Sequence, residues 1–203
     1  MKKFIILGEM TFVAALWAVN VEAGIQGSVH DFSSKTWNTS GEICVVCHTP
    51  HNAGNSIIPL WSHKTTQATF TVYSSTTLNA QVGQPSGISL ACLSCHDGTV
   101  ALDSYGSKTG TAFIQGNALL GTDLTNDHPI SFTYNTALAT VAGDLQDPAT
   151  AGSGVGTTIQ NDLLRNNKME CISCHDVHNG ANSQHLLVKG NAGSALCFTC
   201  HKK

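Results

Sequence analysis

Four copies of one short pattern hold every cysteine of this 203-residue chain. Each copy reads Cys-x-x-Cys-His, with two residues between the cysteines and a histidine directly after the second. Residues three and four apart share one face of a helical turn, so both thiols can reach the vinyl groups of one porphyrin while the histidine ligates its iron. The pattern therefore predicts four covalently attached haem c groups. The predicted attachment residues are Cys44, Cys47, Cys92, Cys95, Cys171, Cys174, Cys197 and Cys200, with His48, His96, His175 and His201 as proximal ligands.

Paired cysteines have three other common uses. An exported chain can carry a disulfide framework, and Cys-x-x-Cys pairs can bind zinc or act as a redox-active pair of the thioredoxin kind. None of these uses requires a histidine after the second cysteine. Histidine is only 10 of 203 residues, so four such histidines by chance have a probability on the order of one in a hundred thousand.

The composition limits what else can fill the interior. Charged residues are 11% of the chain and aromatic residues only 6%, while glycine is plentiful. This supply of side chains is thin for a conventional core, so we expect the haems to form much of it. The predicted fold is mostly coil with short helices at the haem sites and minor β structure, a multihaem cytochrome c fold organised around a haem stack.

Local sequence patterns predict a few secondary-structure elements and one boundary between two halves of the chain. Residues 68–73 alternate and favour a short strand, and residues 94–106 favour one or two helical turns that end at Gly106. Residues 137–157 are rich in alanine, glycine and threonine and predict an irregular surface loop. This loop would separate a front half, residues 24–136 with two haems, from a back half, residues 158–203 with the other two.

The first 23 residues have the character of a signal peptide. Lys2 and Lys3 precede an apolar stretch, and Val21 and Ala23 are the small residues expected before a cut at Gly24. The apolar stretch is too short to span a bilayer. The leader removes two lysines and two glutamates, so the mature net charge stays at −3. We expect an exported protein, extracellular, at the cell surface or periplasmic, without nucleic-acid or anionic membrane partners.

Six further histidines could supply second axial ligands. Met169 is the sole methionine of the mature chain, and it lies too close to Cys171 to cross to the far face of that haem, so it is expected to be a packing residue. Bis-histidine ligation, and hence low reduction potentials, follows. The six histidines are His30, His51, His63, His128, His178 and His185.

Local context distinguishes these six residues. His51 and His178 each lie three residues after a proximal histidine, on the same side of its ring, so each can ligate only a different haem; a surface role is the alternative. His63 follows Trp61 in a loop, and Pro129 favours an extended backbone at His128. His30 lies in an N-terminal segment that can act as an arm, whereas His185 has no comparable context.

Segments outside the haem sites carry a resemblance to a known family. In order they are "VHDFS", "EICVVCHTPHNA", "PLWSHKTT", "TFTVYSSTTLNA", "CLSCHDGTVALDSYG", "NDHPISF", "CISCHDVHN" and "NAGSALCFTCH". Together they resemble the doubled-CxxCH multihaem c-type cytochromes, in particular the tetrahaem OmcE-type extracellular filament cytochromes. The resemblance implies a filament that conducts electrons along a haem stack, in which one subunit can donate an axial histidine to the next. It implies ligand roles for His30, His51, His63, His128 and His178, five residues for four places, so the pairing stays open.

These observations predict electron transfer without substrate chemistry, and hence a protein that is not an enzyme. A filament subunit is the leading hypothesis, with other redox proteins or extracellular electron acceptors as partners and with self-assembly. A monomeric periplasmic electron shuttle is the alternative. A multihaem reductase would need one haem with an open position, and no Cys-x-x-Cys-His site lacks a candidate second ligand.

Overall fold

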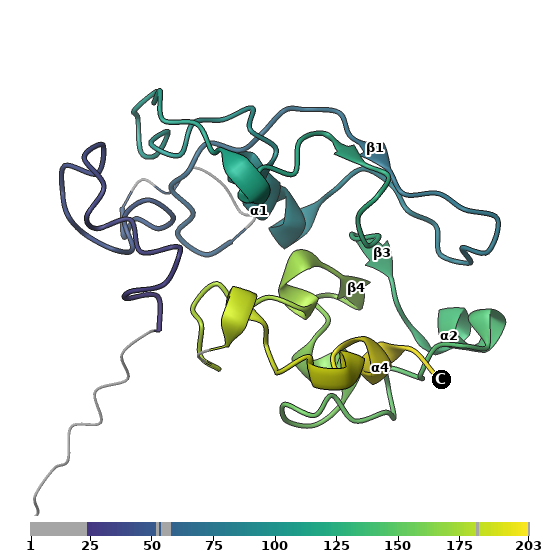
Figure 1. The fold of residues 1–203 in the computed structure, drawn as a ribbon. Helices are drawn as coiled ribbons and strands as arrows, with labels where there is room; N and C mark the ends of the chain where they lie inside the picture. The colour runs from purple at the N-terminus through teal and green to yellow at the C-terminus, as the bar shows by residue number, and fades with distance from the viewer. Residues whose placement is uncertain (1–23, 52, 54–57, 182, 203) are drawn as a thin grey trace, which may run out of the picture.

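The structure is a computed structural model that describes residues 24–51, 53, 58–181 and 183–202. The predicted signal peptide, residues 1–23, lies outside the described residues. Most of the described chain is turn and coil, with a few short helices and minor sheet, as predicted (Figure 1). The α-helices and strands are β1 (Thr71–Val72), α1 (Gly87–His96), β2 (Asp123–Leu124), β3 (Phe132–Thr133), α2 (Thr136–Ala142), α3 (Ile159–Asp162), β4 (Lys168–Met169) and α4 (Cys197–Cys200). Single 3-10 turns are η1 (Gly116–Ala118), η2 (Cys171–Ser173), η3 (Gln184–Leu186) and η4 (Ala192–Ser194).

The strand predicted over residues 68–73 is confirmed only in its last part. β1 is two residues long and pairs in parallel with β2. The side-chain amide of Gln84 binds both backbone groups of Phe70: the Phe70 N–H donates to Oε1 at 2.8 Å, and Nε2 donates to the Phe70 carbonyl at 2.8 Å. Because this side chain satisfies the backbone of Phe70, the ladder does not extend to it.

The helix at the second site lies before the predicted position. α1 ends at His96, so the expected helical turns over residues 94–106 are wrong beyond that residue. The carboxylate of Asp97 accepts from the Thr99 N–H at 2.7 Å and from its hydroxyl at 2.9 Å. Gly98 has a φ of +75°. This Asx turn and left-handed glycine lead the chain out of the helix.

The expected loop over residues 137–157 is also wrong at its start, where α2 covers Thr136–Ala142. The Asn135 side chain accepts from the Leu138 N–H at 2.9 Å, and Gly143 ends the helix with a φ of +73°. Alanine favours the helix between these two signals. The remainder, residues 143–157, is irregular.

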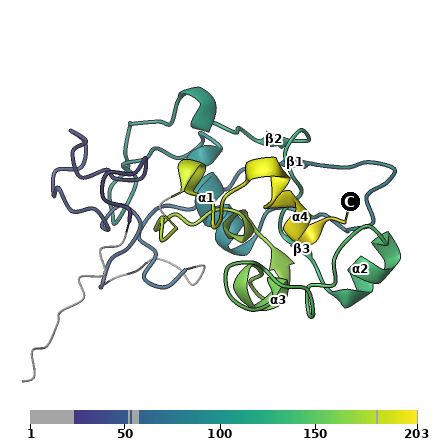
Figure 2. The same cartoon turned by 60° about the horizontal axis from the view of Figure 1, so that its bottom comes forward.

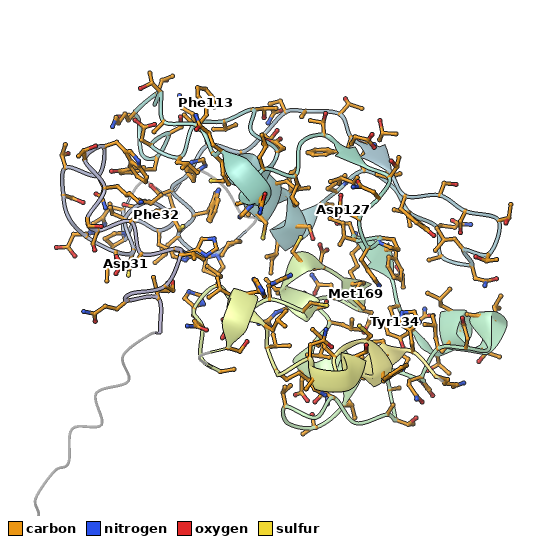
Figure 3. All side chains as sticks on the ribbon, in the orientation of Figure 1. Asp31, Phe32, Phe113, Asp127, Tyr134 and Met169 are labelled. Carbon is orange, nitrogen blue, oxygen red and sulfur yellow. The ribbon has the colours of Figure 1, made fainter. Side chains whose placement is uncertain are left out.

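The larger apolar cluster lies in the C-terminal part of the chain and draws residues from both sides of the predicted boundary. β3 pairs antiparallel with β4 and brings Phe132 opposite Met169. Figure 2 shows α3 near β3 and α4, and Figure 3 shows Tyr134 and Met169 in this part of the molecule. Met169 packs in the cluster, as predicted. The cluster consists of Phe132, Tyr134, Ala139, Ile159, Leu163, Leu164 and Met169.

The second cluster is small and surrounds α1. Phe70, Leu93 and Leu124 form it, with partly buried neighbours on β1 and α1. The helix α1 also packs against η2, which opens the third attachment motif. These contacts set the second and third Cys-x-x-Cys-His motifs beside each other.

Candidate haem sites

Each Cys-x-x-Cys-His motif forms one turn of helical backbone. The N–H of the histidine donates to the carbonyl of the first cysteine at His48, His175 and His201, with distances of 2.8, 3.0 and 2.9 Å. In the second motif the same residues form the last turn of α1. The two cysteines and the histidine therefore share one face, as covalent haem attachment requires. All eight cysteines are free thiols.

The thiol environment does not match a redox-active cysteine pair. Burial raises the pKa of Cys47 to about 11, of Cys95 to about 12 and of Cys200 to about 11. Reactive cysteines of the oxidoreductase kind need a lowered pKa and an electropositive site. These three thiols stay protonated at neutral pH, which disfavours thiol–disulfide chemistry at their motifs. Cys171 differs, because the hydrogen bond from Cys92 lowers its pKa.

Cysteines of neighbouring motifs lie close enough, in sequence order, to affect each other's pKa. Cys47 of the first motif acts on Cys95 of the second, and Cys174 of the third interacts with Cys197 of the fourth. Between the second and third motifs, Cys92 and Cys171 share a hydrogen bond. The four attachment points thus follow one another in space as they do along the chain.

Five histidines are oriented by a backbone carbonyl at Nδ1. An N–H at Nδ1 that donates to a carbonyl leaves the Nε2 lone pair free for a metal, which is the usual arrangement of ligating histidines. Three are proximal histidines and two are predicted second ligands. The bonds join His48 to Pro59 (2.9 Å), His96 to Ala118 (2.8 Å), His175 to His185 (3.0 Å), His128 to Pro129 (2.9 Å) and His63 to Lys64 (2.8 Å).

Three of the predicted proximal histidines each lie close to one predicted second ligand. The ring centroids are 6.4 Å apart for His48 and His178, 6.0 Å for His96 and His30, and 6.3 Å for His201 and His128. A metal lies about 2.0 Å from a ligating imidazole nitrogen, and that nitrogen lies about 1.1 Å from its ring centroid. Two imidazoles on opposite sides of one metal therefore have centroids about 6 Å apart, and the three pairs fit this spacing.

His30 is half-buried. Among the residues that the structure describes, its buried Nδ1 atom has no hydrogen-bond partner. Burial, followed by the nearby His96 and His175, lowers its pKa to about 4. The ring is therefore neutral at physiological pH, which is the form that binds a metal, and a buried polar atom without a partner is costly unless something binds it.

His63 is buried but does not face a proximal histidine. Its Nε2 lies 3.0 Å from the Ala101 carbonyl and 3.6 Å from the sulfur of Cys95. Burial lowers its pKa, although backbone carbonyls, including that of Lys64, oppose the shift. In this conformation Nε2 is directed at a carbonyl, so a turn of the ring must precede any ligation.

The remaining histidines are solvent-exposed. His51 and His185 are both exposed, and among the described residues neither ring is paired with a proximal histidine. His185 instead contributes its backbone carbonyl to the ring of His175. Within the same described part of the chain, His175 has no second histidine opposite it.

Sequence reasoning missed the burial of Glu170 beside an attachment motif. It directly precedes Cys171, and only 4% of its surface is exposed. The signal available in the sequence was an acidic residue beside an attachment cysteine in a chain with few charges. Only the fold reveals that it is buried.

Comparison with known proteins identifies the last two motifs. The model of the doubled CXXCH motif family matches residues 165–203, which contain the attachment motifs of His175 and His201. No curated protein matches the chain. No helix within the described ranges has both the length and the apolar character needed to cross a membrane. The match supports a multihaem c-type cytochrome-like protein with covalently bound haem c, of the kind involved in electron transfer.

Proposed function

We propose that the protein is a tetrahaem c-type cytochrome that carries electrons through closely spaced bis-histidine haems. The observation that carries the proposal is the three histidine pairs at 6.0 to 6.4 Å, each of which joins a motif histidine to a histidine outside its own motif. Two protein ligands satisfy a six-coordinate iron only when a porphyrin supplies the other four.

The proposed axial pairs are His48 with His178, His96 with His30, and His201 with His128. His175 takes its second ligand from His51 or His63, the two candidates that remain. Carbonyl bonds at Nδ1 orient His48, His96 and His128 and favour the ligating tautomer of these three rings.

Bound haem supplies a one-electron couple between ferric and ferrous iron. The chain holds four attachment points in order, from the first motif to the fourth, and this order is the proposed path of the electron. Filled axial positions leave no iron site for a small substrate, so the proposed role is electron transfer without catalysis.

More specifically, the protein is proposed to be a subunit of an extracellular conductive filament. This proposal is supported by the resemblance given above and by the exposed His51, which is accessible to a neighbouring subunit. The partners would be further copies of the chain, other redox proteins and extracellular electron acceptors. Cryo-electron microscopy of shed extracellular material tests this proposal: filaments with an intersubunit ligand support it, whereas particles of single subunits favour a periplasmic shuttle.

The ligand assignment is tested with the purified holoprotein. Haem analysis should give four covalent haems, with electron paramagnetic resonance showing all the iron in the low-spin state. Substitution of His30, His128 or His178 by alanine should each convert about a quarter of the iron to the high-spin state. His185→Ala is the matched control and should convert none. A large high-spin fraction in the unaltered protein would refute the proposal and favour a reductase.

The ligand of the fourth haem is found with two further variants. His51→Ala and His63→Ala are compared in the same spectra, and the one that produces high-spin iron identifies the partner of His175. If His51→Ala instead blocks assembly while the monomer retains its four haems, His51 serves a neighbouring subunit. If neither variant changes the spectra or the assembly, the fourth haem has a ligand outside the proposed set.

A further inference from the structure

Glu170 lies at the contact between the second and third attachment motifs. Its carboxylate accepts hydrogen bonds at Oε2 from the hydroxyl of Ser89 on α1 and from that of Ser131, the latter at 3.1 Å. The Ser89 hydroxyl in turn accepts from the Cys171 N–H at 3.0 Å. A Cβ placed on Gly87 would lie 3.3 Å from Oε1, so the carboxylate faces the first turn of α1. One buried anion therefore joins the helix of one motif to the start of the next.

The charge of Glu170 is not neutralised by an ion pair. Within the described residues its partners are hydroxyls, and it forms no salt bridge. A cation, Lys168, lies at the same end of α1, where its ammonium donates to the Ser86 hydroxyl at 3.2 Å. The N-terminus of the helix contributes only a partial positive charge. A buried charge with neutral partners exerts a long-range field, because little water screens it.

The sulfur atoms of both motifs sense this field. The pKa of Cys92 is raised by its hydrogen bond to Cys171, by burial and by negative neighbours that include Glu170. The hydrogen bond from Cys92 lowers the pKa of Cys171, while burial and the Glu170 carboxylate act in the opposite direction. These two sulfurs are the proposed attachment atoms of two different haems, so the carboxylate lies close to both.

We propose that Glu170 is a tuning residue that lowers the reduction potentials of the two haems attached at Cys92 and Cys95 and at Cys171 and Cys174. This inference rests on the proposed tetrahaem function. Each reduction adds one electron to one ferric iron, and no bond is formed or broken. A fixed negative charge nearby makes that addition less favourable, and burial keeps the effect from being screened.

The consequence concerns the potentials at the middle of the path. The two affected haems are the second and third of four. Glu170 therefore lowers the potentials of the central pair below the values that the same two haems would have without this charge.

The test compares Glu170→Gln with Glu42→Gln in redox titrations of the holoprotein. Glutamine keeps the shape of the side chain and removes its charge. Glu42 is the only other glutamate after the predicted signal peptide, lies two residues before Cys44 and is exposed. Glu170→Gln should raise the midpoint potentials of two of the four haems, and Glu42→Gln should shift none. Four low-spin haems without this shift, or with an equal shift of all four, would overturn the inference.

Three further measurements keep the outcomes separable. The haem content and spin state of the unaltered protein are measured first: fewer than four bis-histidine haems would reject the proposed function itself. If Glu170→Gln does not fold, Lys168→Gln provides a test of opposite sign, since loss of this cation should lower the potentials of the same two haems. Unchanged potentials in that variant would contradict the inference.

Ser89→Ala removes a hydrogen bond to Glu170 but keeps its charge, so this variant should not raise the potentials of the two haems. An upward shift in Ser89→Ala would assign the effect to a structural change and not to the charge.

Discussion

The N-terminal region, residues 24–66, and the C-terminal region, residues 130–202, are stabilised by different forces. In the described part of the N-terminal region, Val46 and Trp61 are the buried apolar side chains, and polar residues such as Asn38 and Thr66 are buried beside them. The C-terminal region instead contains the larger apolar cluster around Tyr134 and Ile159 (Figure 3).

The N-terminal region depends on hydrogen bonds to the loop at residues 103–112. The Lys64 N–H donates to Ser104 at 2.8 Å, and the Gly106 N–H donates to Ser62 at 3.0 Å. The Lys108 ammonium reaches the Trp37 carbonyl at 3.3 Å. A hydrogen bond contributes about 0.5–1.5 kcal/mol of net stability, whereas full burial of one large apolar side chain contributes about 1.5–3 kcal/mol. A covalent haem would supply the apolar surface that this region lacks.

Removal of the first haem should therefore have the largest effect. In a variant with Cys44→Ala and Cys47→Ala, the local opening free energy of residues 24–51 should fall to about 0, because the remaining core there is too small to hold it. Hydrogen exchange read by mass spectrometry measures this. The counterpart with Cys197→Ala and Cys200→Ala should leave protection around Tyr134 and Ile159. Equal losses in both regions would contradict the comparison.

A substitution in the apolar cluster should lower the stability of the C-terminal region, and covalent haem attachment should not compensate for it. Ile159 is fully buried at the centre of the apolar cluster. Ile159→Ala should lower the free energy of unfolding by about 2–5 kcal/mol, because a cavity remains. Calorimetry measures the change, and Val155→Ala, at a site 44% exposed in the same region, is the control. A small effect at Ile159 would show that the cluster is not the source of stability.

Loss of the Asp103 charge should weaken the N-terminal region through its supporting loop. Asp103 is buried, accepts from the N–H groups of Thr111 and Ala112 at 2.8 Å each, and pairs with Lys108 at 3.2 Å. Burial would raise its pKa, but these partners hold the pKa below the ordinary value of 3.8. Asp103→Asn should cost about 1.5–3 kcal/mol at neutral pH, the range for hydrogen bonds to charged groups.

The pH dependence of this contribution has a definite sign. The pKa is lower in the folded state, so the stabilisation is fully present above pH 3.8 and is lost as the pH falls through the folded pKa. Acid unfolding followed by circular dichroism checks it. Above pH 3.8 the variant should be less stable than the unaltered protein, and at lower pH the two should converge. A stability difference that does not depend on pH would assign the effect to packing.

The smallest expected effect concerns α2, at the edge of the C-terminal region. Asn135→Ala removes the side chain that accepts from the Leu138 N–H and should cost about 1 kcal/mol. Thermal unfolding measures it, and Asn135→Asp, which keeps the acceptor, should retain most of the stability. A loss as large as that of Ile159→Ala would mean that α2 is integral to the apolar cluster.

Much of the chemistry could be predicted from local sequence patterns. The Cys-x-x-Cys-His spacing fits within one helical turn, so the attachment residues and proximal histidines follow without knowledge of the fold. The mostly irregular fold followed from the lack of long helical or strand patterns in the sequence. The helix α2 and the early end of α1 were missed, because side chains such as Asn135 and Asp97 decide them through single hydrogen bonds.

The sequence by itself determined which residues can attach a haem, because the two cysteines and the histidine of each site lie within five consecutive residues. It also indicated that His178, three residues from His175, cannot be the second ligand of the haem that His175 binds. Only the tertiary structure decided that His178 faces His48, that His30 faces His96 and that Glu170 is buried between two motifs. These contacts join positions far apart in the sequence, so they depend on the path of the whole chain, and no local spacing specifies that path.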